Sequence, residues 1–86
     1  MTRVSYFRAS DGKREVDFLV QRGSRLVAVE VKLARVVGDA DVRHLVWLED
    51  KLGPALAEAL TVTTGPDAYR RRSDGVLVVP AALFGP

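Results

Sequence analysis

The rest of the fold can be worked out from the stretch REVDFLVQRGSRLVAVEVKL, residues 14–33. Two runs rich in β-branched and other apolar residues flank Gly23 and Ser24. A Gly-Ser pair is typical of a two-residue hairpin turn with glycine first, where a positive φ is needed. We therefore expect an antiparallel hairpin with strands at residues 14–21 and 25–32.

The hairpin register sorts the side chains onto two faces, because successive side chains of a strand point to opposite sides. One face carries Asp17 directly opposite Glu30, with Lys32 two residues further along. Like charges in that position destabilise a sheet, so a divalent cation, a neighbouring ammonium or protonation of one acid should offset the repulsion. An ordinary water-exposed face, with Glu15 paired to Lys32, is the alternative. The other face is a continuous apolar wall that we expect to form the core: Val16, Phe18, Val20, Val27, Val29 and Val31.

The remaining pattern predicts an α/β (α+β) domain with a mixed β-sheet built around this antiparallel β-hairpin core. Apolar residues recur at helical spacing from Val42 to Leu52, between Asp39 as the expected N-cap and Gly53 as the stop. The expected order is β-β-β-α-β-(β)-β, and the crossover through the helix brings in parallel pairing. One helix covers one face, so we expect a partner chain or a further segment over the other. The remaining expected elements are strands at residues 4–9 and 59–65, a turn at 10–13, a short strand or loop at 67–72, a turn followed by a strand within 74–80 and a closing helical turn at 80–84.

Length and composition narrow the class of protein. The 86 residues are expected to form a single domain, 1–86, and the absence of cysteine excludes disulfides and thiolate metal sites. No apolar run approaches the ~20 residues of a membrane span, and we expect a cytoplasmic protein with no membrane partner. The net charge of +2 permits nucleic acid as a partner without arguing for it. Arg70, Arg71 and Arg72 form the one local concentration of positive charge, read either as a solvated segment or as a weak nucleic-acid contact.

An Asp on one strand followed by Glu-X-Lys on the next resembles the PD-(D/E)XK motif of the restriction-endonuclease-like superfamily. The motif here is Asp17 with Glu30-Val31-Lys32, and Val16 stands where the motif has proline. The longer stretch YFRASDGKREVDFLVQRGSRLVAVEVK, with the later TTG and DGVLVVPAALF, resembles the C-terminal domain that follows an AAA+ ATPase module in many bacterial and archaeal proteins. The superfamily's first helix and the ATPase module are missing from this sequence. We therefore expect a truncated core, either a fragment or a shortened relative.

The resemblance implies a metal-dependent nuclease site. Asp17 and Glu30 would bind Mg²⁺ or Mn²⁺, with the backbone carbonyl of Val31 as a further ligand. Lys32 would orient a water or stabilise the charge that develops on a phosphate. The implied reaction is phosphodiester hydrolysis of nucleic acid, with DNA and RNA both left open.

Two other functions stay open on the sequence. One is a catalytically silent interaction or regulatory domain of an AAA+ ATPase, and the other is a structural mini-domain that forms a homodimer to cover its second sheet face. We expect His44 to be a surface or helix-packing residue and Trp47 to pack in the core or against another domain. Binding of Mg²⁺ or Mn²⁺ that depends on Asp17 and Glu30 would favour the nuclease hypothesis.

Overall fold

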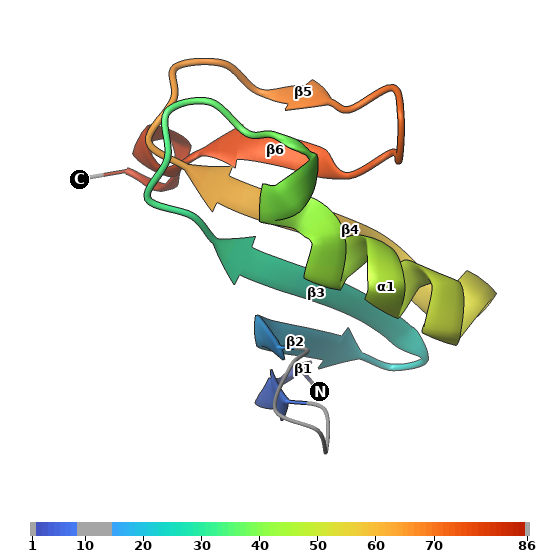
Figure 1. Ribbon diagram of the computed structural model, residues 1–86. Coiled ribbons are helices and arrows are strands. Elements are labelled where there is room, and N and C mark those ends of the chain that lie inside the picture. Colours follow the sequence, from blue (N-terminus) through green and yellow to red (C-terminus); the bar gives the residue numbers. More distant parts are fainter. Residues whose placement is uncertain (1, 9–14, 86) are drawn as a thin grey trace.

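The computed structural model describes residues 2–8 and 15–85 of the chain. It confirms a small α+β domain with a mixed six-stranded sheet and one α-helix (Figure 1). The expected turn at residues 10–13 lies outside the described residues. The strands are β1 (Thr2–Arg8), β2 (Glu15–Arg22), β3 (Arg25–Val31), β4 (Leu56–Thr63), β5 (Tyr69–Arg70) and β6 (Leu77–Pro80). The helical elements are α1 (Arg43–Leu52) and the short 3₁₀ segments η1 (Asp39–Val42), η2 (Gly53–Ala55) and η3 (Ala81–Phe84).

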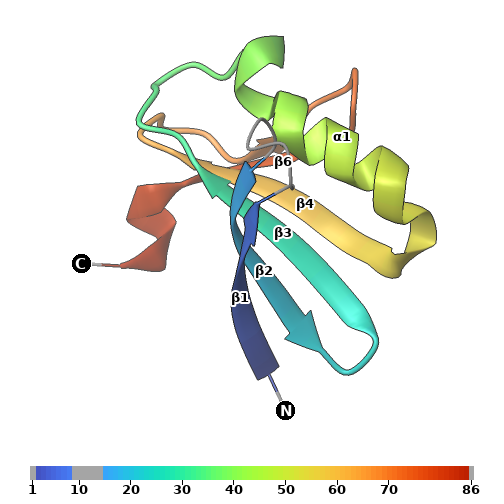
Figure 2. The same cartoon turned by 60° about the horizontal axis from the view of Figure 1, so that its bottom comes forward.

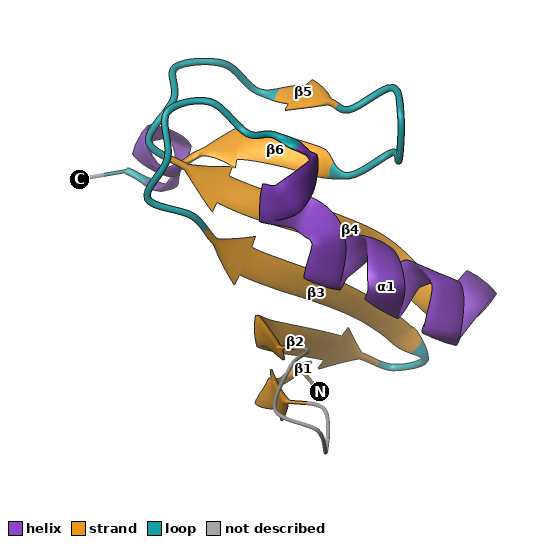
Figure 3. Cartoon of the chain, in the orientation of Figure 1, coloured by secondary structure: helices purple, strands orange, loops and turns teal. Residues whose placement is uncertain are grey.

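The sheet has the strand order β1-β2-β3-β4-β6-β5 (Figures 1 and 3). β1, β2 and β3 pair antiparallel, β3, β4 and β6 pair parallel, and β5 runs antiparallel to β6 at the edge. A parallel neighbour needs a crossover connection, and α1 supplies it between β3 and β4. The expected combination of an antiparallel hairpin with parallel pairing after the helix is confirmed.

The hairpin turn and its register form as expected as far as Phe18. Gly23 has φ 61°, and Phe18 pairs with Val29. The ladder ends at that pair, so the expected backbone pairing of Asp17 with Glu30 does not form. The cause is an irregularity in β2, where Ser5 pairs with Leu19 but Phe7 pairs with Val16, which leaves one more residue on β2 than on β1.

The core lies on the opposite side of the hairpin from the one we expected. α1 packs over the face that carries Ala28 and Glu30, whereas Phe18 and Val31 are 45% and 43% exposed. Val16 alone of the expected core wall is fully buried, since the irregularity in β2 turns it toward the helix. The expectation was wrong because alternation separates two faces without showing which of them the crossover helix will cover. The buried hydrophobic residues are Val16, Ala28, Val37, Val42, Leu45, Leu48, Ala59, Val76 and Val78.

The start of the helical segment also differs from the sequence expectation. Asp39 is the first residue of η1 rather than a cap, and Gly38 takes the N-cap position. The carboxylate of Asp41 reaches back and accepts a hydrogen bond from the Gly38 N–H at 2.8 Å, so the acid that satisfies this end lies inside the first turn. Gly53 ends α1 with φ 52°, as expected. No helix of the described residues is long and apolar enough to cross a membrane.

The second face of the sheet carries no α-helix in the described part of the chain (Figure 2). Phe18 and Val31 are its most exposed members on β2 and β3, and the remaining apolar residues are partly buried. Parallel strands are normally covered on both faces, so this surface is incompletely buried for its topology. We call it the outer face, and its apolar residues on the central strands are Phe18, Val20, Val27, Val29, Val31, Leu60, Val62, Leu77 and Val79.

Candidate functional site

A buried carboxylate lies near the carboxyl end of β3, beneath α1. Glu30 is only 6% exposed, although most acids of globular proteins lie at the surface. Its Oε1 atom is 3.6 Å from Lys32 Nζ and 3.7 Å from His44 Nδ1. Its Oε2 atom is buried and has no hydrogen-bond partner in the described structure. Glu30 is therefore an acid removed from water with only part of its hydrogen-bonding capacity used.

The environment favours the protonated form of Glu30. Burial is the main cause of its raised pKa, and the nearby charge of Asp17 raises the pKa further. Lys32 and His44 act in the opposite direction, without reversing the shift. A group in this condition gains from an additional cation, since positive charge stabilises the carboxylate form.

Asp17 is held at the same end of β3 by a hydrogen bond to the backbone. Its Oδ2 atom accepts the N–H of Val31 at 2.7 Å, where the hairpin ladder has already ended. The N–H of Lys32 donates to the Val62 carbonyl on β4 at 2.8 Å, so the Lys32 backbone faces β4 and that of Val31 faces β2. The N–H and C=O of one strand residue point to the same neighbour, and the Val31 carbonyl therefore lies on the Asp17 side.

Lys32 brings a partly exposed ammonium to the group. It follows Glu30 by two residues, which places both side chains on the same side of the strand, and its side chain is 33% exposed. Asp17, Glu30 and Lys32 thus come together around the end of β3, although not by the cross-strand pairing that the sequence indicated. The expected ion pair of Glu15 with Lys32 involves a side chain outside the described residues.

Two further residues at this site were missed by the sequence analysis. His44, expected to be a surface or packing residue, lies on the first turn of α1 with its side chain 14% exposed and contacts Glu30. It is four residues before the buried Leu48, a spacing that places both on the same side of the helix. Thr61 of β4 pairs directly with Glu30 of β3 and is fully buried, and its Oγ1 atom has no hydrogen-bond partner. The spacing of His44 and Leu48 and the position of Thr61 point to the site only once it is known that α1 covers the face of the sheet that carries Glu30.

The protein oxygens near the end of β3 are of the type that hard divalent cations bind. Among the described residues, no group of three or more His, Cys, Asp or Glu side chains is placed to hold a metal ion. Mg²⁺ nevertheless is usually bound through one or two carboxylates and keeps several waters. Two carboxylates and a carbonyl are available here, and the unpartnered Oε2 atom of Glu30 is the kind of atom that such an ion or its waters would satisfy.

Comparison with protein families places the chain. A family model described as "Domain of unknown function (DUF4143)" matches residues 1–84. The chain belongs to the DUF4143 family. Domains of this family often follow AAA ATPase modules, which agrees with the resemblance found in the sequence. No curated protein and no solved structure matches the chain.

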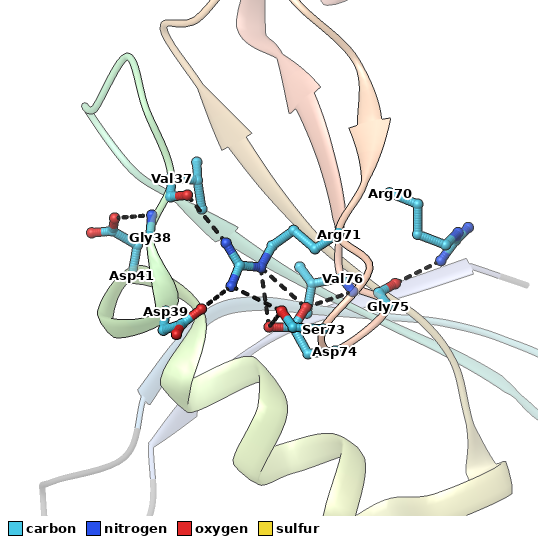
Figure 4. Close-up of polar contacts among 10 residues, drawn as sticks. All are labelled: Val37, Gly38, Asp39, Asp41, Arg70, Arg71, Ser73, Asp74, Gly75 and Val76. Atoms are coloured by element: carbon cyan, nitrogen blue, oxygen red, sulfur yellow. Dashed lines mark hydrogen bonds and ion pairs between the residues drawn. The ribbon is translucent and has the colours of Figure 1, made fainter.

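The arginine run of this DUF4143 domain is largely engaged within the molecule (Figure 4). Arg71 has its side chain only 10% exposed, donates to Asp74 at 3.0 Å and to the Val37 carbonyl at 3.1 Å, and pairs with Asp39. It thereby ties the segment between β3 and α1 to the turn between β5 and β6. Its role in the described structure is to hold these two segments together.

The other two arginines of the run differ from each other. Arg70 makes a bidentate pair with Glu58 at 2.8 and 2.9 Å and also donates to the Gly75 carbonyl. Hydrogen bonding from Arg70 is the main cause of the lowered pKa of Glu58. Arg72 is exposed. The weak nucleic-acid contact predicted for the three arginines stays a prediction.

Proposed function

We propose that this DUF4143 domain is a nuclease-like domain of the PD-(D/E)XK type, which hydrolyses phosphodiester bonds of nucleic acid with a divalent metal ion. The observation that carries the proposal is the state of Glu30. Its buried carboxylate has one unpartnered oxygen, a lysine ammonium beside the other, and a second acid near enough to raise its pKa. A structural ion pair would not need the second acid, whereas a cation site uses both.

Each residue has a role that its position supports. Asp17, Glu30 and the Val31 carbonyl would hold Mg²⁺ or Mn²⁺, and that ion would supply Lewis-acid activation of a water. The Asp17 carboxylate is fixed in place by the Val31 N–H, which is a form of preorganisation. Lys32 has an accessible ammonium that would stabilise the negative charge developing on a phosphate.

The place of the group in the fold is also favourable. Asp17, Glu30 and Lys32 gather at the carboxyl end of β3, which is parallel to β4 and β6. In open sheets with parallel strands, ligands bind outside the carboxyl ends of the strands. The segment between β3 and α1 begins at this edge of the sheet. Arg71 holds this segment in place through a hydrogen bond to the Val37 carbonyl.

The proposal is tested with a nuclease assay on supercoiled plasmid and on single-stranded DNA and RNA, in Mn²⁺ or Mg²⁺. The wild-type chain is expected to cleave at least one of these substrates. Lys32→Ala should abolish cleavage, while Lys51→Ala, which changes an exposed lysine at the end of α1, should retain it. Cleavage that survives Lys32→Ala would refute the proposed role of Lys32, and no cleavage by the wild type in either metal would refute the activity.

The outer face favours a second candidate, an interaction domain that covers its sheet with a second copy of the chain. Phe18 and Val31 are nearly half exposed on the outer face, whose other apolar residues on the central strands are partly buried. A self-complementary apolar face is typical of homodimers. Sedimentation over a range of concentrations should then show a dimer that Phe18→Asp converts into a folded monomer. A wild-type chain that stays monomeric at high concentration would remove this candidate.

A further inference from the structure

Two buried polar atoms without partners lie next to each other beneath α1. Glu30 of β3 and Thr61 of β4 are paired in the parallel ladder, and both are turned toward the helix. Glu30 Oε2 and Thr61 Oγ1 are both buried, and neither has a hydrogen-bond partner in the described structure. Neighbouring strands are only about 4.8 Å apart, so residues paired on one face are close neighbours.

Such a pair of atoms calls for an explanation. Buried polar side-chain atoms almost always have a partner, and where the protein supplies none an ordered water often does. Thr63, the next residue of β4 on the same face, shows the contrast: its Oγ1 atom accepts the Gly65 N–H at 3.2 Å. Thr61 has no comparable backbone donor, and the atom nearest in register that needs a partner is the Glu30 carboxylate.

We propose that Thr61 is a positioning residue for Glu30 and acts through one enclosed water that bridges Thr61 Oγ1 and Glu30 Oε2. A threonine hydroxyl both donates and accepts, so it can adjust to a water that donates to the carboxylate. The bridge satisfies both buried atoms and restrains rotation of the carboxyl group. Oε1 then stays directed at Lys32 and His44, which lie 3.6 and 3.7 Å from it.

This inference deepens the proposed function and rests on it only where metal binding is concerned. A carboxylate that is already held in one orientation loses little conformational entropy when it binds a cation. Partners that orient a ligating carboxylate typically contribute about 10- to 100-fold to metal affinity. The water itself would be present with or without a metal, which gives the inference a test that needs no activity.

The first test compares thermal unfolding midpoints at pH 7 without metal. Thr61→Val replaces the hydroxyl by a methyl group of the same shape. If the water forms the bridge, Thr61→Val lowers the unfolding midpoint, because the water loses the hydroxyl that holds it and Glu30 Oε2 loses its hydrogen-bond partner. In a Glu30→Met background the hydroxyl has no carboxylate to serve, and the same change should leave the midpoint unchanged or raise it. Thr61→Ser keeps the hydroxyl and should fall between the two in the wild-type background.

The opposite outcome is equally clear. A Thr61→Val chain with a midpoint above that of the wild type would show that the hydroxyl is unpaired and that no bridge exists. Thr64→Val, a change of the same kind at an exposed position of the neighbouring loop, serves as the control and should shift the midpoint little. Because the Thr61→Val comparison stands by itself, the inference remains testable even if Glu30→Met fails to fold.

The second test measures Mn²⁺ affinity from the free-ion electron paramagnetic resonance signal. Thr61→Val should weaken binding about tenfold, while Thr61→Ser and Thr64→Val should stay within about twofold of the wild type. Equal affinity of wild type and Thr61→Val would overturn the positioning role and leave the proposed function standing. A wild type that binds no Mn²⁺ would overturn the proposed function, and the unfolding test would still decide on the water.

Discussion

Replacing Glu30 by glutamine should make the metal-free chain more stable, which is an unusual result for a buried ionised residue. Glu30→Gln keeps the size of the side chain and removes its charge. The described part of the protein itself offers no partner to one carboxylate oxygen, and its two cationic neighbours are 3.6 and 3.7 Å from the other. Both distances are longer than the roughly 2.8 Å of a strong charge-assisted hydrogen bond. The two ion pairs therefore offset only part of the hydration free energy that the carboxylate loses on burial.

The expected size follows from the cost of taking a polar group out of water, which is about 1–3 kcal/mol and larger for a charged group. Part of this is offset by Lys32 and His44, so we expect Glu30→Gln to raise the free energy of unfolding at pH 8 by about 1 kcal/mol. For a domain of this size that corresponds to a midpoint about 4–8 °C higher. The measurement is urea and thermal unfolding without metal, followed by circular dichroism.

The pH dependence of unfolding gives a separate check on the direction of the stability change caused by Glu30→Gln. The pKa of Glu30 is raised in the folded chain, so the folded state binds its proton more tightly than the unfolded state. The stabilising effect of that proton is full below the unfolded pKa of about 4.3 and is lost as the pH rises through the folded value. The advantage of Glu30→Gln should therefore be largest at high pH and disappear in acid.

A divalent metal should reverse the order. Mn²⁺ at about 100 times its dissociation constant would stabilise the wild type by about 2.7 kcal/mol and leave Glu30→Gln almost unchanged. Glu58→Gln is the matched control, because the lowered pKa of Glu58 predicts a loss of stability from the same chemical change. If Glu30→Gln is less stable than the wild type at pH 8 without metal, attraction to Lys32 and His44 outweighs the cost of burying the carboxylate. That result would remove the argument that Glu30 needs an additional cation.

Three further predictions concern the scaffold, and urea unfolding checks each of them. Gly65→Ala should destabilise the chain by about 3 kcal/mol, because the new Cβ would lie 2.3 Å from the Arg35 carbonyl oxygen and the backbone would have to move; an unchanged midpoint would contradict this close approach. Arg71→Ala should cost about 3 kcal/mol, since it leaves a largely buried carboxylate unpaired, and a loss below about 1 kcal/mol would show that the ion pairs are dispensable. Leu45→Ala should cost about 3 kcal/mol and Phe18→Ala less than half of that, because α1 covers the Leu45 side of the sheet; equal losses would mean that the outer face is covered in solution.

Local sequence patterns were sufficient for the hairpin, the helix and the succession of elements along the chain. Gly23 and Ser24 form the turn that their conformational preferences predict, and the register holds as far as Phe18 and Val29. The mixed sheet follows from a strand, a helix and a further strand in succession. These features depend on neighbours in the chain, which is why they can be read from one sequence.

The sequence indicated some of the residues of the candidate site but not their arrangement in space. Asp17, Glu30 and Lys32 lie at the same end of β3, but the sequence predicted a cross-strand pair where the structure has the Asp17 carboxylate bound to the Val31 amide. The irregularity in β2 accounts for the difference, and it lies in the pairing with β1, a strand that the pattern of the β2–β3 hairpin does not include. His44 joins the site only because the crossover brings α1 over that face.

By itself, the sequence determined which residues alternate along each strand, where the chain turns and which family it belongs to. Tertiary structure determined which face of the hairpin became the core, and with it whether Glu30 would be solvated or buried. The reason is that the periodicity of a strand is symmetric between its two sides. That symmetry is broken only when the helix packs, and burial of Glu30, the unpartnered Thr61 hydroxyl and the exposed outer face all follow from that single choice of side.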